Sequence, residues 1–208
     1  MKVDELEKYA FSDPASGKQK LKKVRSRQAI VVIGVDHLIR IFVLLAWAGR
    51  LTTSKFRDKL LEVHEKYKPR RFGIEANAMQ ELFGDLVIEK AKEEFGTSKF
   101  IPVNQPTKIE KEFKIRTALE PVIADGRLFL MDDQIELRSE IVSFPTGQLK
   151  DIVDALASAI MLIPRRHPQE ARDTEREALA KYLRDTGAPS WYIEQQMKQQ
   201  EPFRQGVT

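Results

Sequence analysis

The sequence predicts a mixed α/β fold in which three antiparallel strands are followed by parallel strands, with helices on both faces of the sheet. The first observation is that three apolar segments, residues 7–12, 28–35 and 40–47, follow one another near the start of the chain, as in an antiparallel meander. The second is that the hydrophobic period changes after residue 50, where helical segments alternate with short apolar ones. Such alternation places helices on both faces of a sheet.

The strands are predicted from residue type and from the turn residues between them. The segment at residues 28–35 (QAIVVIGV) is rich in β-branched residues, which is typical of a buried strand. Residues 7–12 (EKYAFS) alternate loosely and end at Asp13 and Pro14, where the chain leaves the strand and opens a loop. A tight turn at Asp36 leads into the third strand.

The first helix is predicted to start at a cap formed by Thr53 and Ser54 and to end before Pro69. Its apolar positions include Phe56 and Leu60, which share one face at helical spacing. The remaining elements are helices at residues 76–95, 108–124, 135–143 and 149–163, and short strands at residues 71–74, 99–103 and 127–131. The helix at residues 149–163 is strongly amphipathic, which predicts that it packs on the sheet.

Length and composition limit the possible classes of protein. The chain has 208 residues, and we expect residues 1–165 to form the α/β domain and residues 166–208 to form a helical extension. It has no cysteine, which excludes disulfides and cysteine-ligated zinc. Its longest apolar runs, residues 29–35 and 41–48, are far shorter than the roughly 20 residues of a membrane helix. These features predict a soluble intracellular protein without a membrane partner.

Four carboxylates stand at positions where a sheet gathers its strand ends and helix starts. Asp13 and Glu75 each follow directly on a predicted strand, and Asp151 and Asp154 are three residues apart near the start of the last strong helix. Carboxylates gathered in one place repel one another unless a cation neutralises them, and oxygen ligands select Mg²⁺ or Mn²⁺. The alternative is that Asp13 is a turn residue and that Asp151 interacts with the helix dipole.

The basic residues are concentrated rather than spread along the chain. A segment free of acidic residues follows Asp13 and holds Lys18, Lys20, Lys22, Lys23, Arg25 and Arg27. A second group, interrupted by glutamates, comprises Lys108, Lys111, Lys114 and Arg116. The net charge is +4, and without the first group the basic residues number 29 against 31 acidic ones. The first group lacks interleaved aromatic residues, which favours contact with a phosphate backbone over base stacking, although a solvated loop would show the same pattern.

Five segments, read together, resemble the nuclease domain of bacteriophage large terminases, which has the RNase H-like fold shared with RuvC-type resolvases. The resemblance covers about residues 7–163. The segments are Ser12-Asp13-Pro14-Ala15, residues 29–50, residues 72–80 (FGIEANAMQ), residues 108–121 leading into 125–128, and residues 144–160 (FPTGQLKDIVDALASAI). The order and spacing of these segments carry the likeness more than any one of them.

The resemblance implies that Asp13, Glu75 and Asp154 bind two divalent cations, Mg²⁺ or Mn²⁺, and hydrolyse phosphodiester bonds. Asp151 matches a position that assists the metal or the water in related enzymes. Many terminases have a His-Asp-Asp run here, whereas this chain has Leu149-Lys150-Asp151, so the histidine is missing and Lys150 is expected to contact DNA.

The implied function is an endonuclease that cuts concatemeric double-stranded viral DNA during packaging in the host cytoplasm. Terminase large subunits also carry an ATPase motor, for which this sequence has no phosphate-binding loop motif, so we expect the sequence to be the nuclease part of a longer protein. The implied partners are double-stranded DNA, the ATPase domain, the portal and the small terminase subunit. Two alternatives stay open, which are a junction resolvase or transposase-like nuclease on the same fold, and a non-catalytic DNA-binding module.

Overall fold

A computed structural model describes residues 2–14, 27–76, 81–95, 99–104, 111–164, 177 and 179–199. The chain divides into two compact units, Met1–Ile163 and Pro164–Thr208. In the second unit the described part is helical at residues 179–185 and in α7 (Ser190–Gln199). The first unit holds the sheet and every predicted site residue.

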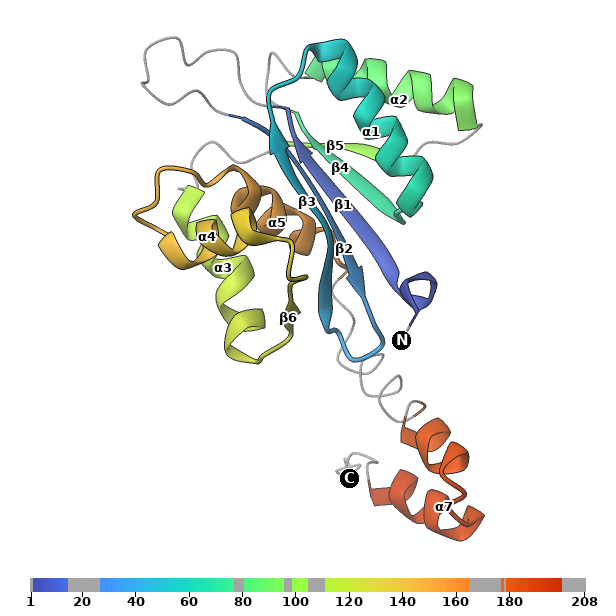
Figure 1. Ribbon diagram of the computed structural model, residues 1–208. Coiled ribbons are helices and arrows are strands. Elements are labelled where there is room, and N and C mark those ends of the chain that lie inside the picture. The colour runs from blue at the N-terminus through green and yellow to red at the C-terminus, as the bar shows by residue number, and fades with distance from the viewer. Residues whose placement is uncertain are drawn as a thin grey trace, which may run out of the picture. The chain divides into compact units, whose positions relative to one another are not determined.

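The first unit is built on a six-stranded mixed sheet with the order β5-β4-β1-β2-β3-β6 (Figure 1). The strands are β1 (Glu7–Asp13), β2 (Gln28–Val35), β3 (Ile41–Gly49), β4 (Arg71–Glu75), β5 (Phe100–Val103) and β6 (Leu128–Phe129). β1, β2 and β3 pair antiparallel, whereas β4 is parallel to β1, β5 to β4 and β6 to β3. This topology confirms the predicted mixed sheet, in which a meander continues into parallel strands.

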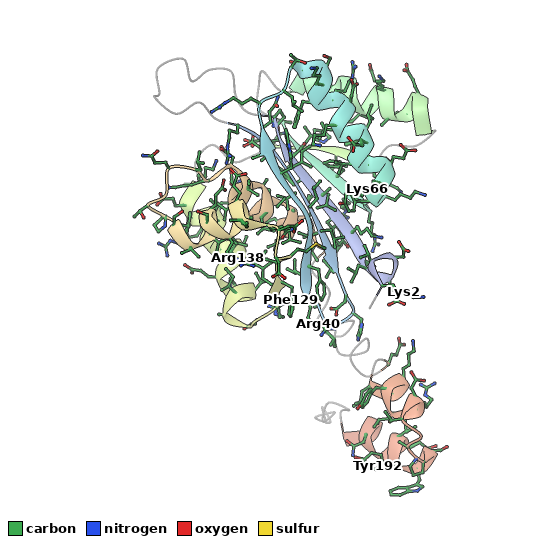
Figure 2. The ribbon with its side chains drawn as sticks, viewed as in Figure 1. Lys2, Arg40, Lys66, Phe129, Arg138 and Tyr192 are labelled. Atoms are coloured by element: carbon green, nitrogen blue, oxygen red, sulfur yellow. The ribbon has the colours of Figure 1, made fainter. Side chains whose placement is uncertain are left out.

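Helices cover both faces of the sheet, as Figure 1 shows. After a short 3₁₀ turn (Val3–Glu5), the helices of this unit are α1 (Thr53–Tyr67), α2 (Glu81–Phe95), α3 (Lys111–Ala124), α4 (Ile135–Ser143) and α5 (Asp151–Met161). α1 and α2 lie on one face, and α3, α4 and α5 lie on the other. The side chains of the strands fill the space between the sheet and each helical layer (Figure 2).

Each face of the sheet has its own hydrophobic core because side chains alternate along a strand. In β1, Phe11 belongs to the core under α5, and Ala10 belongs to the core under α1. The first core also contains Leu156 of α5, and the second contains Phe56 of α1. All four residues are almost fully buried. The sheet is thus held from both sides, which fixes the positions of its strand ends.

Several element boundaries differ from those predicted. The side chain of Thr52, rather than Thr53 or Ser54, accepts the capping hydrogen bond of α1 from the N–H of Lys55. The helix predicted at residues 149–163 is shorter and begins at Asp151. The last strand has two residues, and its Phe129 stacks on Phe42 of β3 with ring centroids 4.9 Å apart (Figure 2). Residues 77–80 and 108–110, which are predicted to belong to the first turns of two helices, lie outside the described residues.

The tight turn predicted at Asp36 joins β2 to β3. Its buried carboxylate accepts the backbone N–H groups of Leu38 and Arg40 through Oδ1. The Arg40 side chain also donates to Oδ2 at 2.7 Å. In the described part of the chain, no helix is long and apolar enough to cross a membrane.

Candidate active site

Two of the predicted carboxylates end neighbouring strands. In the parallel pairing of β1 with β4, Ser12 lies opposite Ile74, so Asp13 and Glu75 follow at the same level on adjacent strands. Phe11, two residues before Asp13, packs in the core under α5, and side chains alternate along each strand. Asp13 and Glu75 are therefore on the face that α5 covers.

The first turn of α5 supplies the other two carboxylates. Asp151 and Asp154 are three residues apart on this helix, and both are buried. Burial, followed by repulsion from Asp13 and then from Asp154, raises the pKa of Glu75 from 4.5 to about 7, although Lys114 and Lys111 oppose this shift. The structure therefore brings Asp13, Glu75 and Asp154 into one electrostatically coupled cluster.

Two lysines of α3 neutralise the innermost member of this cluster. Lys111 Nζ lies 2.8 Å from Asp154 Oδ2, and Lys114 contacts Asp154 Oδ1. Lys114 also donates to the hydroxyl of Ser158, one turn further along α5, at 3.1 Å. The side chain of Lys114 is only 10% exposed, whereas that of Lys111 is 46% exposed and remains open to solvent. The two ammonium groups are one helical turn apart and hold both oxygens of Asp154.

The charge of Lys111 is set by several carboxylates at once. Burial alone would lower its pKa, but attraction to and a hydrogen bond with Asp154, together with attraction to Asp13 and Asp151, raise the pKa above its ordinary value. Lys111 therefore stays cationic beside the cluster. Because its side chain is partly exposed, it is also the lysine that a phosphate could approach.

Asp151 is held by a different cation. Arg27 donates from Nε to Asp151 Oδ2 at 3.2 Å and from Nη2 to Glu140 Oε1 at 2.8 Å, and its Nη1 contacts Glu136. The Arg27 side chain is 12% exposed, so its guanidinium group forms ion pairs inside the protein and is largely shielded from solvent. This residue precedes β2 and joins the start of α5 to α4.

Glu140 is the functional candidate that the sequence analysis missed. It lies on α4, is almost fully buried, and accepts the backbone N–H groups of Ile152 and Val153 through Oε2, each at 2.9 Å. Burial raises the pKa of its carboxyl, which these N–H groups and Arg27 partly counteract. One signal in the sequence could have suggested such a partner. Lys150 precedes the helix but is not a residue type that caps helices, so the first N–H groups of the helix need an acceptor from elsewhere in the chain.

Of the residues predicted to contact nucleic acid, some form ion pairs within the protein and others lie outside the described residues. Lys111 and Lys114 contact Asp154, Arg116 pairs with Glu120 on the surface of α3, and Lys150 lies 2.8 Å from Glu112. The hydrogen bond from Lys150, followed by the attraction of its charge, lowers the pKa of Glu112. The other members, Lys18, Lys20, Lys22, Lys23, Arg25 and Lys108, lie outside the described residues.

The donor chemistry of the cluster fits a divalent cation, because Asp13, Glu75 and Asp154 offer carboxylate oxygens whose mutual repulsion a cation would relieve. Among the residues that the structure describes, no three Asp, Glu, His or Cys side chains are grouped closely enough to hold a metal ion as they stand. A cation would therefore enter this cluster in competition with the ammonium groups on Asp154.

No family model and no curated protein matches this chain. Among solved structures, the RuvC of T. thermophilus, alone and in complex with a Holliday junction substrate, is similar with a TM-score of 0.41 and 13% identity, over 73% of this chain and 90% of RuvC. The yeast mitochondrial Holliday junction resolvase Ydc2 is similar with a TM-score of 0.42 and 10% identity, over 64% of this chain and 72% of Ydc2. At this level of similarity, what the chain does has to be inferred from its own residues.

Proposed function

We propose that this chain is a metal-dependent endodeoxyribonuclease that hydrolyses phosphodiester bonds of double-stranded DNA. The observation that carries the proposal is the meeting of Asp13, Glu75 and Asp154, which come from β1, β4 and α5. Burial, together with repulsion from Asp13 and Asp154, raises the pKa of Glu75 to about 7. A protein gains no stability from gathering buried like charges, and perturbed carboxylates of this kind are typical of functional sites.

In this proposal, Asp13, Glu75 and Asp154 hold two divalent cations, Mg²⁺ or Mn²⁺, with Asp151 beside them. When bound, such ions would activate a water molecule and stabilise the leaving oxygen of the phosphodiester. The residues of this chain provide the oxygen ligands and fix their directions, because two are anchored in strands and two in the first turn of a buried helix.

The two lysines of α3 fit different roles, Lys111 in binding the substrate and Lys114 in holding the carboxylate. Lys111 is half exposed and lies within hydrogen-bond distance of Asp154, so a phosphate oxygen at the cluster would meet an ammonium group already positioned there. Lys114 is mostly shielded from solvent and contacts Asp154 and Ser158, so it orients the carboxylate rather than meeting DNA. The basic segment after Asp13, of which Lys20, Lys22 and Lys23 are members, would extend the contact along the phosphate backbone.

We further propose that the nuclease belongs to a viral terminase large subunit and cuts concatemeric DNA during genome packaging in the host cytoplasm. This part of the proposal depends on the terminase-like segments described above, from Ser12-Asp13-Pro14-Ala15 to residues 144–160. Its partners would be double-stranded DNA, the ATPase domain of the same subunit, the portal and the small subunit.

The test is to compare two substrates, linear concatemeric DNA and a synthetic four-way junction, each with Mn²⁺, with Mg²⁺ and with EDTA. The proposal predicts metal-dependent cutting of the linear DNA with little sequence preference. Paired, symmetric nicks confined to the junction, made by a protein that light scattering shows to be a dimer, would instead indicate a resolvase. Absence of cutting on both substrates, together with a flat Mn²⁺ calorimetric titration, would indicate a non-catalytic DNA-binding module.

A further inference from the structure

The start of α5 depends on a residue from another helix. The first N–H groups of any α-helix have no partner within the helix and need one from outside. Within the described residues, the N-cap residue Lys150 gives α5 no side-chain hydrogen bond. The N–H groups of Ile152 and Val153 are instead taken by Glu140 Oε2, each at 2.9 Å. A buried carboxylate on α4 thus acts as the cap of α5.

The second oxygen of the same carboxylate connects the cap to the site. Glu140 Oε1 accepts from Arg27 Nη2 at 2.8 Å, and Arg27 Nε donates to Asp151 Oδ2 at 3.2 Å. Glu140 is 3% exposed and Arg27 is 12% exposed, so these ionic contacts are shielded from water. Hydrogen bonds between charged groups in such surroundings are short, directional and stronger than neutral ones.

This network fixes the orientation of the turn that carries two of the four carboxylates. Asp151 is held directly by Arg27, and Asp154 is one turn into the helix that Glu140 caps. A small rotation or shift of this turn would move both carboxylates relative to Asp13 and Glu75, which are fixed in the sheet. Ligands of a metal site must be held within about 0.5 Å of the productive geometry.

We propose that Glu140 and Arg27 are positioning residues that hold the first turn of α5 so that Asp151 and Asp154 face the strand-end carboxylates. The proposal rests on the proposed nuclease function. It adds that cation binding depends on two side chains that do not themselves belong to the carboxylate cluster. The contacts connect α4, the first turn of α5 and the residue that precedes β2, so they also hold these three segments together beside the site.

The test uses Glu140→Gln, in which the amide oxygen can still accept from the helix while the amide NH₂ group faces the Arg27 guanidinium. We expect its affinity for Mn²⁺, measured by calorimetry, and its kcat on plasmid DNA each to fall by about 10–100-fold. The KM for DNA is expected to stay within about twofold, because no phosphate contact is removed. Arg27→Met should give the same pattern. Arg27→Lys should show a smaller fall, because an ammonium group can keep one of the hydrogen bonds that Arg27 makes to Glu140 and Asp151.

Glu136→Gln is the matched control. It removes a carboxylate from the same guanidinium, but Glu136 is 50% exposed and makes no hydrogen bond or ion pair with the described residues of α5. Its Mn²⁺ affinity and kcat are expected to stay close to those of the wild-type protein. A loss equal to that of Glu140→Gln would show a general charge effect and overturn the positioning role.

Two further outcomes separate this proposal from the one on which it rests. If Asp154→Asn loses Mn²⁺ binding and cutting while Glu140→Gln and Arg27→Met keep both, the nuclease stands and the positioning role is wrong. If the wild-type protein neither binds Mn²⁺ nor cuts DNA, both proposals fail. Should thermal melting show that Glu140→Gln does not fold, the comparison of Arg27→Lys with Arg27→Met decides, and equal values for these two would contradict the role.

Discussion

The ammonium group of Lys111 lies 2.8 Å from Oδ2 of Asp154, at the point where carboxylates from two strands and a helix meet. Together with Lys114, it supplies the positive charge that lets Asp154 remain buried. The sequence predicts that both lysines contact DNA. The structure shows that both are counter-ions of Asp154 within the protein, so the proposed DNA binding and the proposed cation binding would meet at one carboxylate.

Replacing Lys111 is expected to change cation affinity and DNA affinity in opposite directions. Lys111→Met removes a positive charge that competes for Asp154, so Mn²⁺ should bind severalfold more tightly in calorimetry. DNA should bind more weakly, because one cationic partner of the phosphates is removed. Lys66→Met, on the surface of α1 at the other face of the sheet, is the control and should change neither. Unchanged or weaker Mn²⁺ binding by Lys111→Met would contradict the counter-ion role.

The raised pKa of Glu75 predicts a pH dependence of stability. In the folded protein its pKa is about 7, against 4.5 for the ordinary side chain, so the native state holds a proton that the unfolded state has released. Stability from this group is therefore full below pH 4.5 and is lost as the pH rises to about 7. Urea unfolding in EDTA should show the free energy of unfolding of the wild type falling in this window relative to Glu75→Gln. Parallel curves for the two proteins would exclude the shift.

A close contact under β4 predicts a packing effect near the site. A Cβ atom at Gly73 would lie 2.7 Å from Phe11 Cδ2 and 3.0 Å from Leu162 Cδ1, in the core between the sheet and the end of α5. Gly73→Ala is therefore expected to reduce the free energy of unfolding by about 1–3 kcal/mol, measured by urea denaturation. Stability equal to that of the wild type would show that the core can absorb the extra methyl group.

The basic segment after Asp13 gives a prediction that depends on the sequence alone, since Lys20, Lys22 and Lys23 lie outside the described residues. Neutralising these three lysines should reduce the slope of log K against log salt by roughly 0.9 for each phosphate group that the protein no longer neutralises. The measurement is DNA binding by fluorescence anisotropy over a range of salt concentrations. An unchanged slope would mean that the segment is solvated and does not touch DNA.

Local patterns explain why much of the fold could be predicted. The β-branched run at residues 28–35 matches β2 (Gln28–Val35), because such residues pack well in a buried strand. The positions of Asp13 and Glu75 at strand ends followed from the same reasoning. The boundary at Thr52 was missed by one residue, because Thr52, Thr53 and Ser54 are all capping residues and only the backbone conformation distinguishes them.

The parts of the site that were missed depend on contacts between residues far apart in the chain. Arg27 is separated from Glu140 by 113 positions and from Asp151 by 124, and no period or motif connects them. Arg27 belongs by sequence to a basic segment, so a solvent-facing role was the natural expectation. Its partners became visible only when the sheet placed the start of β2 beside α4 and α5. In the same way, Glu140 is by sequence only one acidic residue of a short helix. Its role depends on the packing of α4 against the start of α5, where it accepts the N–H of Ile152.

The most direct test of the central claim is plasmid cleavage in Mn²⁺ by the wild-type chain and by Asp13→Asn, Glu75→Gln and Asp154→Asn, with Asp125→Asn, a surface carboxylate paired with Arg127, as the matched control. The wild type and the control are predicted to convert supercoiled DNA to nicked and linear forms, and EDTA should stop both. The three cluster variants are predicted to stay folded in thermal melts and to leave the plasmid intact. Cleavage by folded cluster variants at the wild-type rate would contradict the claim that these carboxylates form the active site.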